Sequence, residues 1–147
     1  MNLRILNKKE TSRILNKIKE HFEINEIKLN GKLLQNKEGK IFLITKDINK
    51  VNLNKLRINN IGLYIANYEK ELRLTIEGTQ LFGKFAKKNI HEINNDEVKL
   101  WMTGNKLKSS KIYSGFVIIK NGENFFGTGK YKDNEILNYV PKERWIK

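Results

Sequence analysis

Apolar residues near the start of the chain recur at the spacing of an amphipathic helix. Within residues 8–22 they share one face of the helical period, and they are Ile14, Leu15, Ile18 and Phe22. Asn7 stands just before this segment and Glu10 lies three residues later, which is the pattern of a capping box. The sequence therefore predicts a helix over residues 8–22 with a lysine-rich opposite face.

The pattern then changes to the alternation that is typical of strands. Residues 27–45 contain short apolar runs separated by Asn30–Gly31 and by the turn Asn36–Gly39, which predicts strands joined by hairpins. Asp47 follows, and it predicts the cap of a short helical turn that extends to Lys50.

Residues 61–76 predict another hairpin, which turns near Glu69–Glu71. The next segment, residues 77–83, is bounded by glycines and too short for a strand, so one or two helical turns are expected. A strand is expected within residues 87–93.

A second capped helix is predicted after Asn94. Glu97 occupies its third position, Gly104 ends it, and its apolar face is expected to be Val98, Leu100 and Trp101.

The last part of the chain predicts a long hairpin over residues 115–131. It turns at Asn121–Gly122, and a final strand precedes Pro141. Residues 105–111, which read NKLKSSK, are expected to be a flexible basic loop. The apolar positions of the hairpin are expected to be core, and they are Phe116, Val117, Ile118, Ile119, Phe125 and Phe126.

This order of elements predicts an α+β fold with two units of similar size. The composition changes near Arg73–Glu77, which divides the chain into residues 1–74 and residues 75–147. Neither a low-complexity linker nor an internal repeat is evident.

Charge narrows the possible functions. The chain has 147 residues, a formal net charge of +13 and a pI near 9.8, which is the footprint expected of a nucleic-acid-binding protein. Lysine enrichment also follows from an AT-rich genome or a hot environment. The first ten residues are too polar for a secretory signal, and no segment approaches the ~18 apolar residues of a membrane span, so we expect a cytoplasmic protein without membrane contact.

The residue patterns of catalytic sites are missing from the sequence. Gly127–Gly129 lies between strands and opens no helix, so it is not a phosphate-binding loop. His21 and His91 have no neighbouring ligands in sequence, cysteine is absent, and Asp96–Glu97 is explained by helix capping. We therefore expect a binding protein, not an enzyme, with no cofactor and no metal. An enzyme whose site residues are scattered along the sequence is a further, less favoured alternative.

Four segments of the chain resemble, in order, a family of small archaeal proteins. These are similar to the C-terminal region of Sun/fmu-type RNA cytosine-C5 methyltransferases, in which a pre-PUA domain precedes a PUA domain. The segments are residues 56–83, 87–107, 114–131 and 136–145. The resemblance implies an N-terminal α/β pre-PUA domain, a PUA-like β pseudobarrel over about residues 75–147, and no methyltransferase activity, because the cofactor-binding domain and its cysteine are absent.

The resemblance also implies an RNA-binding surface. In PUA domains RNA contacts the first short helix, the glycine-bounded loop after it and the last strands. Two lysine clusters, in KFAKK and KLKSSK, add phosphate-binding charge. The expected RNA-binding residues are Gly78, Gly83, Lys84, Lys87, Lys88, Lys106, Lys108, Lys111, Lys130, Tyr131, Lys142 and Arg144.

Two questions about this surface stay open in the sequence. Tyr131, Tyr139 and Trp145 are candidates for stacking on bases, although Tyr139 and Trp145 could instead pack in the barrel or between the units. The expected partner is rRNA or tRNA. The alternative is a protein-interaction subunit of a separate RNA-modifying enzyme, which would show an apolar patch on residues 1–70.

Overall fold

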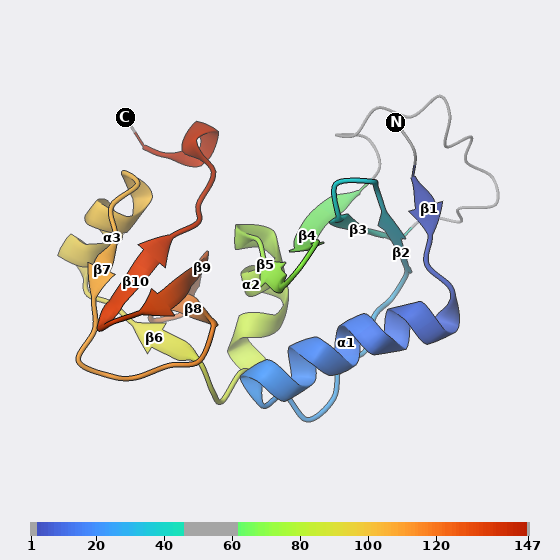
Figure 1. Ribbon diagram of the computed structural model, residues 1–147, viewed down its shortest axis with the longest axis horizontal. Helices are drawn as coiled ribbons and strands as arrows, with labels where there is room; N and C mark the ends of the chain where they lie inside the picture. The colour runs from blue at the N-terminus through green and yellow to red at the C-terminus, as the bar shows by residue number, and fades with distance from the viewer. Residues whose placement is uncertain (1–2, 46–61, 147) are drawn as a thin grey trace.

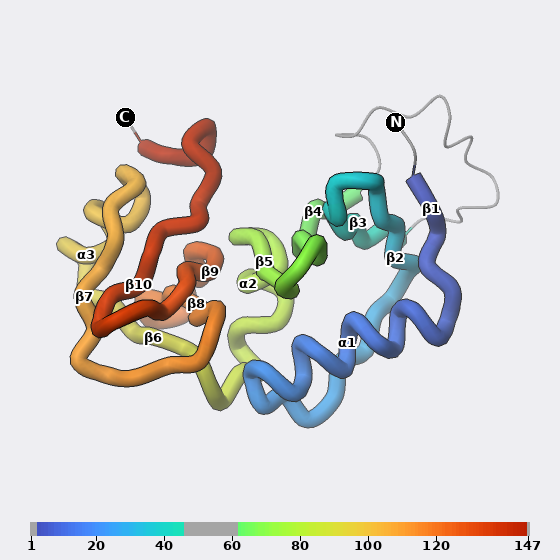
Figure 2. Tube along the Cα trace, in the orientation of Figure 1, coloured from blue at the N-terminus to red at the C-terminus, as the bar shows by residue number. Residues whose placement is uncertain are grey.

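Two sheets lie side by side, with a short helix between them (Figure 1). The computed structural model describes residues 3–45 and 62–146. The chain path in Figure 2 shows helix α1 (Lys8–Phe22) running along the first sheet and ending beside the second. The predicted turn from Asp47 to Lys50 lies outside the described residues.

The first sheet has the order β1-β2-β3-β4-β5, and all neighbouring strands are antiparallel. Its strands are Arg4–Ile5, Lys32–Gln35, Lys40–Ile44, Leu63–Tyr68 and Leu72–Leu74. The predicted turns at Asn36–Gly39 and Glu69–Glu71 are confirmed, because they join β2 to β3 and β4 to β5.

The prediction of a strand before Asn30–Gly31 is wrong. Residues 26–29 form no strand, and the edge of β2 that they would need is occupied by β1. The Leu6 amide extends this pairing by donating to the Leu33 carbonyl at 2.9 Å. Strand β2 therefore pairs with β1, from the start of the chain, and Asn30–Gly31 does not join two strands.

Helix α1 begins as predicted. The Asn7 side chain accepts a hydrogen bond from the Glu10 amide at 2.8 Å, and Glu10 Oε1 accepts one from the Asn7 amide at 3.1 Å. This capping box satisfies two backbone donors that have no partner inside the helix.

The second sheet has the order β6-β8-β9-β10-β7 and curls into a half-barrel. Strand β6 runs parallel to β8, and the other pairs are antiparallel. The strands are Ile90–Glu92 (β6), Leu107–Lys108 (β7), Phe116–Asn121 (β8), Asn124–Lys132 (β9) and Glu135–Asn138 (β10). The expected α+β fold with a PUA-like pseudobarrel is confirmed, whereas the expected loop at residues 105–111 contains the edge strand β7.

Short helices complete both units. The predicted turn at residues 77–83 is confirmed as α2 (Ile76–Phe82) followed by a 3-10 turn, η4 (Gly83–Phe85). The Asn94 cap is also confirmed: it precedes α3 (Asn95–Met102), and Trp101 of that helix is fully buried. Leu100 was expected in the same apolar face but is 50% exposed, because consecutive helical residues point in different directions. A last 3-10 turn, η5, spans Lys142–Arg144.

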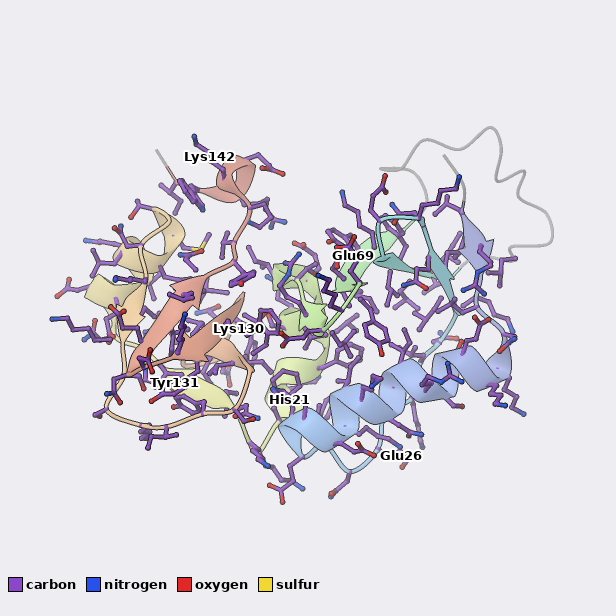
Figure 3. The ribbon with its side chains drawn as sticks, viewed as in Figure 1. His21, Glu26, Glu69, Lys130, Tyr131 and Lys142 are labelled. Atoms are coloured by element: carbon purple, nitrogen blue, oxygen red, sulfur yellow. The ribbon has the colours of Figure 1, made fainter. Side chains whose placement is uncertain are left out.

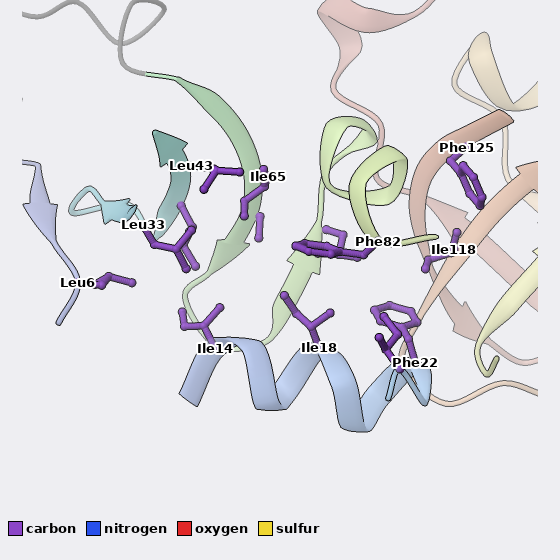
Figure 4. Close-up of a cluster of buried hydrophobic side chains, with 14 residues drawn as sticks. Leu6, Ile14, Ile18, Phe22, Leu33, Leu43, Ile65, Phe82, Ile118 and Phe125 are labelled. Carbon is purple, nitrogen blue, oxygen red and sulfur yellow. The ribbon is translucent and has the colours of Figure 1, made fainter. Parts of the chain in front are cut away.

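One hydrophobic cluster extends from the first unit into the second (Figure 4). Phe82 of α2 belongs to the same cluster as Phe22 of α1, and Ile118 and Phe125 of the second sheet complete it. A separate cluster around Trp101 fills the half-barrel. The division of the chain at residues 74 and 75 stays a prediction, since the core crosses it.

Candidate nucleic-acid interface

Gly127 and Gly129 are explained by packing against α2 and α3. Gly127 has φ +83°, and its amide donates to Thr79 Oγ1 of α2 at 3.0 Å. A Cβ on Gly129 would lie 2.6 Å from the Trp101 ring and 2.5 Å from Ile136 Cγ2. Both glycines are buried, so they let β9 approach the helices closely.

Gly78 and Gly83, two expected RNA contacts, are also buried. A Cβ on Gly78 would lie 2.0 Å from the Ile65 carbonyl oxygen, and one on Gly83 would lie 2.4 Å from the Phe125 ring. Close packing of α2 therefore requires glycine at both positions, and their contact with RNA stays a prediction.

Lys84, Lys87 and Lys88 are exposed on the short segment between α2 and β6. The amides of Lys87 and Lys88 both donate to the Phe22 carbonyl, at 2.8 and 3.1 Å, which fixes this segment to the end of α1. Within residues 3–45 and 62–146, none of the three ammonium groups forms a salt bridge. We call Lys84, Lys87 and Lys88 the lysine triad.

The second lysine cluster is held by β7. Lys106 pairs with Glu135 at 2.9 Å, whereas Lys108 and Lys111 are exposed and have no ion pair within the described part of the chain. Ser109 Oγ donates to the Lys111 carbonyl at 2.7 Å and accepts from the Lys111 amide at 3.2 Å, which places Lys111 on a turn that follows β7.

Lys130 and Arg144 are both engaged by carboxylates. Lys130 pairs with Glu71 of the β4–β5 turn, and this hydrogen bond raises the pKa of Lys130. Arg144 makes two hydrogen bonds to Glu77 of α2, at 3.0 and 2.9 Å, which lower the pKa of the Glu77 carboxyl and raise the pKa of Arg144.

Lys142 lies on η5, apart from Lys130 and Tyr131 on β9 (Figure 3). Tyr131 is half-buried, and its hydroxyl donates to Asn134 Oδ1 at 3.1 Å. The expected RNA-binding residues are thus spread over several parts of the surface.

A groove of about 800 Å³ brings Lys84 and Arg144 together. It runs past α2 and the β8–β9 turn, and it is also lined by Gln80, Lys120 and Phe126, which the sequence did not single out. Lys120 could have been suspected from its place beside the turn at Asn121–Gly122. Arg144 is paired with Glu77 and Lys120 lies 3.8 Å from Glu92, so Lys84 is the cation of the groove that has no ion pair within the described residues. Gln80 and Phe126 add an amide and an aromatic side chain, and Glu123 adds a carboxylate.

Residues 88–146 match the family model of the methyltransferase RsmF PUA domain. No curated protein matches the chain. The matched segment contains the whole second sheet, from β6 to β10, together with α3 and η5. We call residues 88–146 the PUA-like unit, and α2, Lys84 and Lys87 lie just before it.

The stacking candidates Tyr139 and Trp145 of the PUA-like unit differ in their exposure. Trp145 donates from Nε1 to the Val140 carbonyl at 2.9 Å, and Gly104 lies against its ring. Tyr139 packs edge-on against Phe116, with the Arg73 side chain 5.9 Å from its ring centre. Trp145 is half-buried, which agrees with the packing interpretation, whereas Tyr139 is 41% exposed, so stacking of a base on Tyr139 stays a prediction.

His91 of the PUA-like unit belongs to an aromatic cluster. Its Nδ1 lies 2.8 Å from the Tyr113 hydroxyl, and Tyr113 contacts Tyr131 edge-on. Burial lowers the pKa of His91 and raises that of Tyr113, so both side chains are neutral near pH 7. Within residues 3–45 and 62–146, no three His, Asp or Glu side chains are grouped to hold a metal ion.

The helices within residues 3–45 and 62–146 are short or polar. None of the helices in this part of the chain has the length and the apolar character required to cross a bilayer.

Proposed function

We propose that this protein binds structured RNA, rRNA or tRNA, through the lysine triad and the adjoining groove of the PUA-like unit. The observation that supports this proposal most is the triad itself: its three lysines form no salt bridge within the described residues, and the amides of Lys87 and Lys88 fix the segment at the start of that unit to the end of α1. Lysines position a phosphate backbone without reading its sequence. PUA domains are RNA-binding modules, and the match over residues 88–146 agrees with that chemistry.

In this proposal the protein is an adaptor in RNA modification or ribosome biogenesis, and an RNA-modifying enzyme is its possible partner. It would supply binding and orientation without a cofactor, and the chemical step would take place elsewhere. The PUA-like unit resembles a part of a methyltransferase family that is a binding module, which favours this division of roles.

The alternative, a subunit that works mainly through protein contacts, has less support. Among the described residues of positions 1–70, the large exposed apolar side chains are Ile5 and Leu63. They lie on β1 and β4, which are separated by two strands, so they do not form one patch.

Binding measured at several salt concentrations tests the proposal. We expect labelled tRNA or an rRNA stem-loop to bind more tightly than duplex DNA of equal length. If about five lysines contact phosphates, the slope of log K against log salt should be roughly −3.5 to −4.5. Equal affinity for RNA and DNA would show that the net charge acts without selectivity, and absence of binding at moderate salt would favour the protein-interaction alternative.

A further inference from the structure

A second hollow lies between the two units, away from the groove. It is a cleft of about 450 Å³ between the end of α1, the β4–β5 turn and the loops that precede β6 and β8. His21 marks this end of α1 in Figure 3, close to the second unit. Each wall contributes one lysine, and these are Lys17, Lys70 and Lys88.

The cleft has an excess of positive charge. Lys17, Lys70 and Lys88 are exposed, and within the described part of the chain none of them forms a salt bridge. Of the two carboxylates in the lining, Glu71 is occupied by Lys130, which leaves Glu20. Three free ammonium groups around one opening favour a phosphate.

Tyr68 supplies an aromatic wall. It is half-buried, and Lys17 Nζ lies 5.5 Å from the centre of its ring. The Lys17 ammonium lies over one face of the ring, so a base that stacks on this face takes the place of the ammonium. A nucleobase could stack there, because every base has a flat face that an aromatic side chain accepts.

The floor of the cleft is fixed by a hydrogen-bond network. Asn89 is buried with φ +55°, its Nδ2 donates to the His21 carbonyl at 2.9 Å, and its Oδ1 accepts from the Ser114 amide at 3.0 Å. His21 Nε2 lies 2.7 Å from the Phe116 carbonyl and 3.3 Å from Asn89 Nδ2, so His21 joins the end of α1 to both β8 and the loop before β6. The cleft is therefore preformed and loses little freedom when it is occupied.

We propose that this cleft holds one unpaired nucleotide of the bound RNA, with its base on Tyr68 and its phosphate among the three lysines. The proposal rests on the RNA-binding function proposed above and adds a specificity to it. A volume of about 450 Å³ accepts a single nucleotide, as small-ligand pockets of about 300–1,000 Å³ do. A paired base cannot enter, because it is held in the duplex stack.

Two RNA duplexes that differ by one bulged uridine test this specificity. We expect the protein to bind the bulged duplex about tenfold more tightly, as one stacked base provides. The double variant Lys17→Gln, Lys70→Gln should lose this preference, and Tyr68→Leu should lose it without a change in charge. The matched control, Lys8→Gln with Lys9→Gln on the exposed start of α1, should keep it.

Equal affinity of the protein for both duplexes, or a preference that survives in the Lys17, Lys70 variant, would overturn the cleft proposal and leave the lysine triad untouched. If neither duplex binds, the proposed RNA function itself fails. In that case a titration with free uridine 5′-monophosphate, followed by amide chemical shifts, tests the cleft alone. Changed shifts at Lys70 and Ser114 would show that the cleft binds a free nucleotide, and unchanged shifts would overturn the cleft proposal.

Discussion

Four glycines of this protein are required because other atoms occupy the space that a side chain would need. The sequence indicates that Gly78, Gly83, Gly127 and Gly129 permit close approach, but not whether RNA or protein approaches. The structure places a helix, a carbonyl group or an aromatic ring against each of them. Those partners are distant in sequence, so local patterns could not predict them.

Gly129→Ala should lower the free energy of unfolding by about 1–3 kcal/mol, because the new methyl group would overlap Trp101 and Ile136. Gly122→Ala is the control, since no atom lies within 4 Å of that position and only the left-handed backbone, at φ +61°, opposes it, at roughly 1 kcal/mol. Urea denaturation compares the two. A smaller loss for Gly129→Ala than for Gly122→Ala would contradict the packing account.

His91 should make stability depend on pH. Burial lowers its pKa in the folded state, so below its ordinary pKa of about 6.5 the unfolded chain binds more protons and stability falls as the pH decreases. The charged groups that act on it are Glu97, Lys111 and Glu92. Urea denaturation between pH 7.5 and 5.5 should show this loss of stability, and His91→Gln should reduce the loss. The same pH dependence in the His91→Gln variant would contradict a role of His91.

Helices with capping residues in their own sequence were predictable, whereas short strands that form only by pairing with another strand were not. Both capping boxes appear in the sequence as an asparagine followed three residues later by a glutamate, and both helices begin there. Strands β1 and β7 have two residues each, which is too short to show a period, and their existence depends on pairing with β2 and β10.

Helix α3 should depend on its cap. Asn94→Ala removes the 2.8 Å hydrogen bond that the Glu97 amide donates to Asn94 Oδ1, and it should cost about 0.5–2 kcal/mol of stability. Lys99→Ala, an exposed substitution in the same helix, should cost much less. Thermal unfolding of the two variants measures the difference, and equal effects would mean that the cap contributes nothing specific.

Contacts between the two units determine how much of the candidate interface is free. Lys130 and Arg144 were expected to contact RNA, yet they pair with Glu71 and Glu77 on elements that precede the PUA-like unit. The sequence could not show this, because the paired residues are 59 and 67 positions apart. The strands of the two sheets part between Leu74 and Ile90, but one hydrophobic cluster extends across this boundary, so the division into residues 1–74 and 75–147 stays a prediction.

The triad itself could be predicted as a charge cluster, and its rigid attachment to the end of α1 could not. Its three lysines follow one another closely in sequence, so their proximity needs no knowledge of the fold. The hydrogen bonds from the Lys87 and Lys88 amides to the Phe22 carbonyl depend on where α1 ends in the fold.

RNA binding by a charge-reversed triad tests the central claim most directly. The variant Lys84→Glu, Lys87→Glu, Lys88→Glu is compared with Lys8→Glu, Lys9→Glu, Arg13→Glu, which makes the same charge change on exposed residues of α1. Both should fold, as circular dichroism can verify. We expect the triad variant to lose at least about tenfold in affinity for structured RNA through its phosphate contacts, and the control to lose much less. Equal losses in the two variants would contradict a binding surface at Lys84, Lys87 and Lys88.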